Sequence, residues 1–284
     1  KREMFARQWL EVARSLSCHS SDDRDGKKWF PLSKGGRFRR WYGNNDFVIN
    51  YGQNGKDLRA NNANLRSEKM YFTDGITWSV ISTDGFGVRK LPANSLFDQV
   101  GSAIHCREDD KLYLGDILGS PNTKVVSEIS MQISPTITFT TGDIRKFPLW
   151  KMTDGGKLVD TCVQLAKSDW DDFETSWDFT ILPLLSSDYR GATLETTYAR
   201  VHTHWQSMTD EMQRLEEENN RIFIDAYGLQ DELTPEVPIE QITLTCNPAY
   251  RYGVKGSAED RETRLRADTT VPYTHLTLPT ASPM

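Results

Sequence analysis

The sequence has few cysteines and no long hydrophobic run, and both absences narrow the class of protein. Its 284 residues include four cysteines, Cys18, Cys106, Cys162 and Cys246, with no Cys-x-x-Cys pair. This scatter is typical of a reducing compartment and argues against a disulfide framework or a zinc ribbon, so we expect these side chains to be buried as small apolar residues. No apolar run approaches the roughly 20 residues that a membrane span needs. We therefore expect a cytoplasmic protein without a membrane partner.

Familiar catalytic and metal-binding motifs are also missing. The sequence contains no P-loop, no His-Glu-x-x-His motif and no Ser, His and Asp set. His202 and His204 are two residues apart, so on a helix they point in different directions and make a poor metal pair. The acidic run DWDDFE (169–174) is most simply the solvated face of a helix. We predict no catalytic residue and no metal site in this chain.

Both ends of the sequence indicate a piece of a longer protein. The chain begins with Lys1 rather than methionine and has no signal segment, so we interpret it as a fragment whose amino-terminal part is missing. The last residues, VPYTHLTLPTASPM (271–284), differ in composition from the rest and resemble translated sequencing-adaptor sequence. We treat them as an artefactual tail and leave them out of the functional interpretation.

Charge is distributed unevenly along the chain, although the net charge is only −6. Residues 1–153 hold 23 Lys+Arg against 17 Asp+Glu, a balance of +6, whereas residues 154–236 hold 6 against 18, a balance of −12. A polyanionic partner is therefore expected on the first part and repelled by the second. The cations concentrate over residues 24–40, where seven Lys or Arg face only Asp25.

Hydrophobic spacing predicts an α+β fold. Helical periodicity covers residues 1–17, 111–133, 157–178 and 198–226, and Gly228 is expected to end the last of these helices. Turn signals separate runs that predict strands. These runs are FVINY (47–51), ITWSVIS (76–82), FGVRKL (86–91), TITF (136–139) and QITLTC (241–246).

The helix predicted over 198–226 carries the a/d seam of a heptad, so we expect an apolar partner to pack along one side of it. We predict that it pairs with 157–178 as an antiparallel, coiled-coil-like spacer. The seam residues are Tyr198, Val201, Trp205, Met208, Met212, Leu215 and Ile222.

These patterns divide the chain into five parts. We expect the end of a preceding helical segment (1–26), a small mixed-sheet recognition domain (27–150), a helical spacer (151–230), a short terminal strand or connector (231–270) and the tail (271–284).

The stretch KWFPLSKGGRFRRWYGNNDFVINY (28–51) brings cations, aromatic rings and bare backbone together. Lys and Arg neutralise phosphates and release counterions, glycines let backbone N–H groups approach a phosphate, and amide side chains can pair with an adenine edge. The rings either stack against DNA or pack into the core beneath the loop, and both alternatives stand. A second stretch, GITWSVIS with FGVR, adds polar side chains that form either a contact surface or an ordinary solvated face.

The candidate DNA-binding residues fall into three groups. The predicted phosphate contacts are Lys27, Lys28, Lys34, Arg37, Arg39 and Arg40. The predicted close-approach and stacking positions are Gly35, Gly36, Trp41 and Tyr42. The candidates for base or sugar contacts are Asn44, Asn45, Thr77, Ser79 and Arg89.

The segment TLTCNPAYRYG (243–253) is the one partial match to a catalytic motif. Enzymes that methylate the amino group of a DNA base use Asn-Pro-Pro followed by an aromatic residue after a strand, with the amide holding the flipped base. Here Asn247 and Tyr250 fit, but Ala249 stands at the third position, and no glycine-rich cofactor-binding unit precedes it. We predict a turn after a strand.

Taken in order, several motifs resemble the PglX family, the adenine-specific DNA methyltransferases of BREX phage-exclusion systems. They are KWFPLSKGGRFRRWYGNNDFVINY, GITWSVIS with FGVR, FDQVGSAI and SPTITFTTGDIRKFPLW, which resemble its target-recognition portion. DWDDFETSWDF and NNRIFIDAYGLQDELTPEVPIEQITL are similar to it too, so the likeness covers about residues 1–255. The same order of motifs resembles the specificity halves of single-chain restriction–modification enzymes.

The resemblance implies a full-length parent with an upstream N6-adenine methyltransferase domain that uses S-adenosylmethionine, whereas this fragment binds no cofactor. It implies double-stranded DNA as a partner, together with other subunits of the phage-defence system. It also implies that residues 27–150 are related to the specificity subunits of type I systems. We therefore expect a module that recognises duplex DNA and is inactive alone. The alternatives are a protein-interaction module that docks through the 198–226 helix, or the specificity region of a related restriction–modification enzyme.

Overall fold

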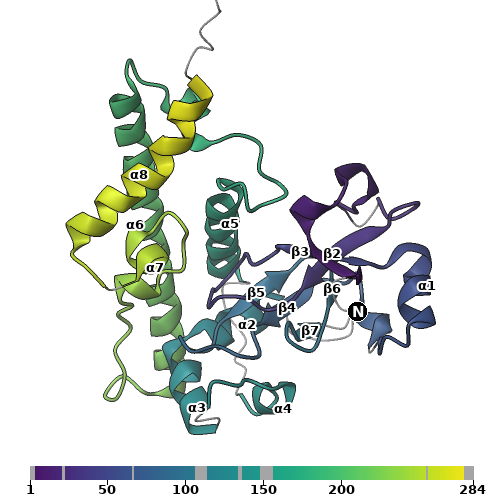
Figure 1. Ribbon diagram of the computed structural model, residues 1–284. Coiled ribbons are helices and arrows are strands. Elements are labelled where there is room, and N and C mark those ends of the chain that lie inside the picture. The colour runs from purple at the N-terminus through teal and green to yellow at the C-terminus, as the bar shows by residue number, and fades with distance from the viewer. Residues whose placement is uncertain are drawn as a thin grey trace, which may run out of the picture. The chain divides into compact units, whose positions relative to one another are not determined.

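The computed structural model describes residues 4–20, 23–65, 67–105, 114–133, 136–147, 156–253 and 255–277 (Figure 1). The chain divides into two compact units: the first is Lys1–Lys167 with Glu218–Pro235, and the second is Ser168–Glu217 with Glu236–Met284. Helices and two small sheets confirm the predicted α+β class. Within the described ranges, no helix combines the length and the apolar character needed to cross a membrane.

Both sheets belong to the first unit. A four-stranded sheet has the order β1-β3-β2-β6, and a three-stranded sheet has the order β5-β4-β7. All neighbouring strands are antiparallel except the parallel pair β2 and β6. The strands are β1 (Ala6–Gln8), β2 (Trp29–Ser33), β3 (Phe47–Asn50), β4 (Gly75–Trp78), β5 (Val88–Leu91), β6 (Leu96–Phe97) and β7 (Ala103–His105).

Strands β2 and β3 position the predicted DNA-binding loop. They pair from Trp29 opposite Asn50 to Leu32 opposite Phe47, so residues 34–46 connect them at one end of the ladder. Every residue of β2 is buried, which fixes this strand in the core. The core beneath it is made of Cys18, Phe30, Leu32, Tyr51, Leu58, Tyr71 and Leu96.

Short helices complete the first unit, and α5 and α6 each supply residues to both units. Helix α1 (Gly52–Ala60) follows β3 in the chain and contacts it. The helix predicted over 111–133 is present but broken, because a 3-10 turn containing Pro121 separates its two halves. Residues 111–113 of that prediction lie outside the described ranges. The other helices are α2 (Leu114–Gly119), α3 (Lys124–Ile133), α4 (Thr141–Ile144), α5 (Lys157–Asp171) and α6 (Leu194–Tyr227).

Two predicted elements of the first unit are wrong. Residues 1–17 do not form the predicted helix in their described part: β1 pairs with β3, with Ala6 opposite Ile49, and two 3-10 turns follow. Pairing with the edge of β3 therefore overrides the local helical spacing. TITF (136–139) forms no strand either, since its one sheet-like contact is a single bridge between Ile81 and Thr138.

The second unit is helical and contains most of the heptad seam. Helix α6 ends before Gly228, whose positive φ of 68° closes the helix as predicted. The six seam residues from Tyr198 to Leu215 are all buried, and Phe173 stacks on Trp205 with ring centroids 6.1 Å apart. This part of the seam is therefore occupied by the chain itself, which contradicts the alternative of an open docking surface along it. Helices α7 (Pro248–Tyr252) and α8 (Ala258–Thr277) complete the unit.

The predicted strand QITLTC (241–246) is wrong, and a buried carboxylate explains why. Asp169, with 0% exposure, accepts hydrogen bonds from the backbone N–H groups of Thr245 at 2.6 Å and Cys246 at 2.8 Å. These amides are therefore not available to a neighbouring strand. The prediction that the acidic run is a solvated face is wrong for Asp169 as well. Helix α8, which includes residues 271–277 of the predicted tail, was not predicted from the sequence.

Candidate nucleic-acid interface

The loop between β2 and β3, residues 34–46, is held in an irregular and compact shape. Gly35, Gly36 and Gly43 have positive φ angles, and so do the non-glycine residues Trp41 and Asn44. The Asn44 amide donates to the Arg37 carbonyl at 2.8 Å, and a Cβ atom on Gly36 would lie 2.8 Å from the same amide nitrogen. The glycine at position 36 is therefore required for the loop to fold onto itself.

Two candidate base-contact residues support this loop from inside. Arg89, at 1% exposure, donates to the carbonyl groups of Gly35 at 3.4 Å and Arg39 at 3.5 Å. The Ser79 hydroxyl donates to the Gly36 carbonyl at 2.8 Å. These contacts direct both side chains towards the backbone of the loop, so the structure gives them a supporting role in place of the predicted contact with bases.

Strand β5 carries the loop as well. The Trp41 N–H donates to the Val88 carbonyl at 2.9 Å, and the Lys90 N–H donates to the Trp41 carbonyl at 2.8 Å. Thr77, a third candidate for base contact, is 3% exposed, and its hydroxyl lies 2.6 Å from that of Ser33. Thr77 thus joins the two sheets within the first unit and does not face solvent.

A half-buried carboxylate lies in the electrostatic field of Arg39 in the loop and Arg89 on β5. Burial raises the pKa of Asp46, and the positive charges of Arg39 and Arg89 act in the opposite direction. The guanidinium groups thus stabilise a carboxylate that would otherwise lose hydration at high cost. Part of the positive charge read from the sequence is therefore compensated inside the unit.

The predicted site residues consequently differ in exposure. Lys28, Gly36 and Arg37 are exposed, and Lys27, Lys34 and Asn45 are partly exposed. Arg39 and Arg40 were predicted to contact phosphates. They are only 6% and 7% exposed, so their side chains belong to the interior of the unit. The buried positions are Gly35, Arg39, Arg40, Trp41, Tyr42, Asn44, Thr77, Ser79 and Arg89.

The aromatic residues of the loop follow the packing alternative. Trp41 is 1% exposed and Tyr42 is 6% exposed, so neither ring is open to a nucleic acid. The Lys167 amine lies 5.2 Å from the centre of the Tyr42 ring. These rings anchor the loop, and the candidate interface is reduced to exposed cations and backbone.

Two of the accessible cations mark the two ends of β2. The Lys28 amine lies 5.5 Å from the Trp29 ring centre, and the Lys34 amine lies 4.0 Å from the Phe47 ring centre. Both distances are within the range of a cation–π contact, which limits where each amine can point. The Lys27 amine is less available to a ligand, because it pairs with Asp23 at 3.1 Å and donates to the Ser15 carbonyl at 3.0 Å.

A groove of about 680 Å³ at the other end of β2 was not predicted from the sequence. It is lined by the turn at residues 24–28 and by residues 50–57, where Gln53, Asn54 and Gly55 adopt the left-handed conformation one after another. A left-handed non-glycine residue costs roughly 1–2 kcal/mol, so such a run is rare outside functional segments. The Asn-Gly pair at 54–55, a common turn signal, is the sequence feature that accompanies this run.

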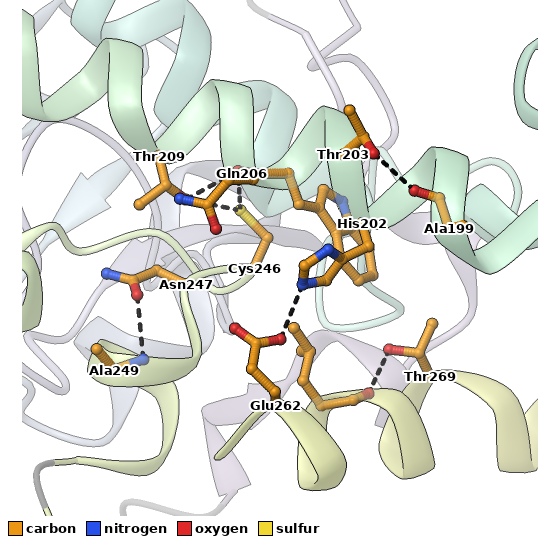
Figure 2. A network of polar contacts seen from close by, with 12 residues as sticks. Ala199, His202, Thr203, Gln206, Thr209, Cys246, Asn247, Ala249, Glu262 and Thr269 are labelled. Carbon is orange, nitrogen blue, oxygen red and sulfur yellow. Dashed lines mark hydrogen bonds and ion pairs between the residues drawn. The ribbon is translucent and has the colours of Figure 1, made fainter. Parts of the chain in front are cut away.

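The Asn247 segment is a helix start and not an open catalytic site (Figure 2). The Asn247 amide nitrogen donates to the carbonyl groups of Ile239 at 2.7 Å and Ile242 at 2.8 Å, while its oxygen accepts from the Ala249 N–H at 3.1 Å. Asn247 is 1% exposed and Tyr250 is 5% exposed. Every polar atom of the amide is used within the chain, so the predicted turn after a strand is instead the start of α7, with no strand over 241–246.

Beside Asn247, a small pocket of about 160 Å³ contains His202 and Glu262 (Figure 2). The His202 Nε2 atom lies 2.8 Å from a Glu262 carboxylate oxygen. Cys246 is buried next to them, and burial raises its pKa well above the usual value, so this thiol is not a reactive thiolate. Over the described residues, no group of three or more His, Cys, Asp or Glu side chains could hold a metal ion.

The two known proteins compared with this chain are both adenine-specific methyltransferases. The chain is 38% identical over 267 residues, or 94% of its length, to the adenine-specific methyltransferase BrxX of Escherichia coli O9:H4 (strain HS). It is 35% identical over 258 residues, or 85% of its length, to the adenine-specific methyltransferase PglX of Lacticaseibacillus casei (strain Zhang). These matches cover 22% and 21% of the two relatives, so the chain spans about a fifth of their length. No family model matches the chain.

Proposed function

Since this chain is homologous over most of its length to a stretch of the PglX family of adenine-specific methyltransferases, we propose that it is the part that recognises duplex DNA. The DNA contact is made by the loop at residues 34–46 together with the start of β2. Transfer of the methyl group from S-adenosylmethionine to adenine is carried out by sequence outside these 284 residues. The parent system is phage defence of the BREX type, in which other subunits are further partners.

The observation that carries this proposal is an irregular loop that is rigid inside and cationic outside. Lys34 and Arg37 are its accessible cations, Lys28 adds a further one at the start of β2, and Arg89 and Ser79 hold the loop backbone from below. A loop whose shape is already fixed loses little conformational entropy when it binds. Cations on such a loop can therefore favour phosphate contacts more than flexible surface lysines do.

The burial of Arg39 and Arg40 changes what the proposal predicts for affinity. Of the six cations predicted from the sequence, four are at least partly exposed, and one of these, Lys27, is paired with Asp23, so fewer counterions are released on binding. We expect moderate affinity with a moderate dependence on salt. The contact thus orients DNA and supplies only part of the affinity of a full-length parent.

The proposal places no methyl transfer at Asn247, because its amide already caps α7 and bonds two carbonyl groups. We therefore expect isothermal titration of this chain with S-adenosylmethionine to give no heat of binding. Measurable binding, abolished in an Asn247→Ala variant that remains folded, would contradict this part of the proposal.

Charge reversal in the loop tests the DNA contact. We expect a Lys34→Glu/Arg37→Glu variant to lose at least about tenfold in affinity for a labelled duplex, since two favourable contacts become repulsive. Fluorescence anisotropy at low salt measures this loss. The matched control is Arg214→Glu/Lys255→Glu, which makes the same charge change at exposed positions of the second unit. Equal losses in both variants would mean that only net charge matters and would overturn the proposed site.

A further inference from the structure

The groove opposite the loop has a composition suited to reading a base. We call it the amide groove and define it by Arg24, Lys28, Gln53, Asn54, Lys56 and Phe72, which are among the residues that line it. We propose that it holds one step of the duplex, with Lys28 and Lys56 on phosphates and the amides of Gln53 and Asn54 on the major-groove edge of an adenine. This inference rests on the proposed function and assigns it a base-reading position.

The two amide side chains are exposed and adjacent. Gln53 and Asn54 are both exposed, and neither side-chain amide makes a hydrogen bond to another residue in the described part of the chain, although the backbone carbonyl of Asn54 accepts one from Arg59. A carboxamide offers one donor and one acceptor, which matches the N6 and N7 atoms of adenine. Among the residues that the sequence singled out for base contact, only Asn45 remains partly exposed, so the amides of Gln53 and Asn54 offer base-contact groups that the sequence did not single out.

The backbone beneath these amides is fixed before any ligand binds. The Gly55 N–H donates to the Tyr51 carbonyl at 2.9 Å, and the Arg59 side chain donates to the Asn54 carbonyl at 3.3 Å. The turn at residues 24–28, which forms the opposite wall of the groove, packs closely against this segment: a Cβ atom on Gly52 would lie 3.2 Å from the Cα atom of Lys28. The φ angles of 52° and 56° at Gln53 and Asn54 are therefore set by the fold. A fixed backbone is what directional recognition of a base requires.

The net positive charge of the groove favours binding of a nucleic acid but is too small to supply most of the binding affinity. Four cations line it, Arg24, Lys27, Lys28 and Lys56, against the carboxylates of Asp25 and Asp57. Asp57 also accepts a hydrogen bond from Asn50 at 3.2 Å. The excess of positive charge is small, so we assign the groove a role in sequence discrimination and the loop a larger role in general affinity.

The distance between the groove and the loop agrees with two contacts on one duplex. Lys28 and Lys34 flank the five residues of β2. Six steps along a strand span roughly 20 Å, which is about six base pairs at 3.4 Å each. The adenine read by the groove is therefore expected about half a helical turn from the phosphates bound by the loop.

Selection from a randomised pool of duplexes tests this assignment. The main variant is Gln53→Gly/Asn54→Gly, because glycine keeps the left-handed backbone and removes only the amides. We expect it to bind bulk duplex DNA within about twofold of the unmodified chain but to lose preference for adenine at one or two positions, by about tenfold or more. A Lys28→Ala/Lys56→Ala variant is expected to bind all duplexes more weakly, with a salt slope smaller by about 2.

The outcomes separate this inference from the proposed function. Recovery of the same consensus by the glycine variant, when its thermal unfolding matches that of the unmodified chain, would overturn the amide groove. If Lys34→Glu/Arg37→Glu still weakens binding in that case, the proposed function stands. Failure of the unmodified chain to bind any duplex in the pool would overturn both.

Discussion

In the first unit, the buried Arg89 donates hydrogen bonds to carbonyl groups of an irregular loop, whereas in the second unit the buried Asp169 accepts from the backbone amides of an irregular connector. Each charge satisfies backbone groups that have no neighbouring strand or helix to bond. The contacts of Asp169, at 2.6 and 2.8 Å, are shorter than those of Arg89, at 3.4 and 3.5 Å. The connector should therefore depend more on its charge than the loop does.

Removal of the Asp169 carboxylate should have the largest effect. Asp169→Ala leaves the N–H groups of Thr245 and Cys246 buried without acceptors, and we expect a loss of about 3–4 kcal/mol in the free energy of unfolding. Urea denaturation followed by circular dichroism measures it. Glu174→Ala is the matched control, since Glu174 is exposed in the same acidic run and should change stability by less than about 0.5 kcal/mol. Equal effects in the two variants would show that the acidic run is a solvated face after all.

Removal of the Arg89 guanidinium should have a smaller effect on stability. Arg89→Met keeps the length of the side chain but leaves carbonyl groups of the loop without a donor, so we expect a loss of about 2 kcal/mol. Affinity for DNA should fall together with stability, because the loop loses its support. Arg37→Met provides the contrast: it should weaken DNA binding while the free energy of unfolding stays within about 0.5 kcal/mol. A fully stable Arg89→Met variant with normal DNA affinity would contradict the supporting role.

Asp172 should oppose folding, unlike Asp169. Burial raises its pKa to about 6, the Trp205 N–H lowers it in part, and the charges of Asp169 and Asp171 raise it further. Because the folded pKa exceeds the unfolded one, the folded chain binds the proton more tightly, and stability falls as the pH rises from about 4 to about 6. We expect Asp172→Asn to raise stability at pH 7 by about 1–2 kcal/mol, after allowance for its partial exposure.

Unfolding measured at a series of pH values checks this prediction. The difference between Asp172→Asn and the unmodified chain should be largest above pH 6, as the pKa of about 6 requires, and should shrink towards pH 4. A variant that is less stable at pH 7 would mean that the Trp205 contact outweighs the cost of burying the charge.

Regular patterns in the sequence predicted the regular parts of the fold. Alternating residues around Val48 and Val88 form β3 and β5, and the heptad spacing from Tyr198 to Leu215 forms α6. The prediction of a helix over residues 1–17 was wrong because Phe5 and Trp9 have helical spacing, although the residues between them pair with β3. Local spacing contains no information about an edge strand that a distant segment supplies.

The candidate site was predictable only as a region. The sequence places Arg37, Arg39 and Arg40 within four positions, but only Arg37 is exposed, and Arg39 acts on the half-buried carboxylate of Asp46. Which arginine turns inward depends on partners such as Asp46 and the loop carbonyl groups, whose position no local pattern encodes. The left-handed run at Gln53 was hidden for the same reason, since Gly52 and Tyr51 fix it through contacts made in the folded chain.

The salt dependence of DNA binding tests the central claim most directly. With three or four accessible cations on phosphates, the slope of log affinity against log salt concentration should lie between about −2.7 and −3.6. In a Lys34→Ala/Arg37→Ala variant it should become shallower by about 2. A slope near zero, or an unchanged slope in the variant, would contradict the account.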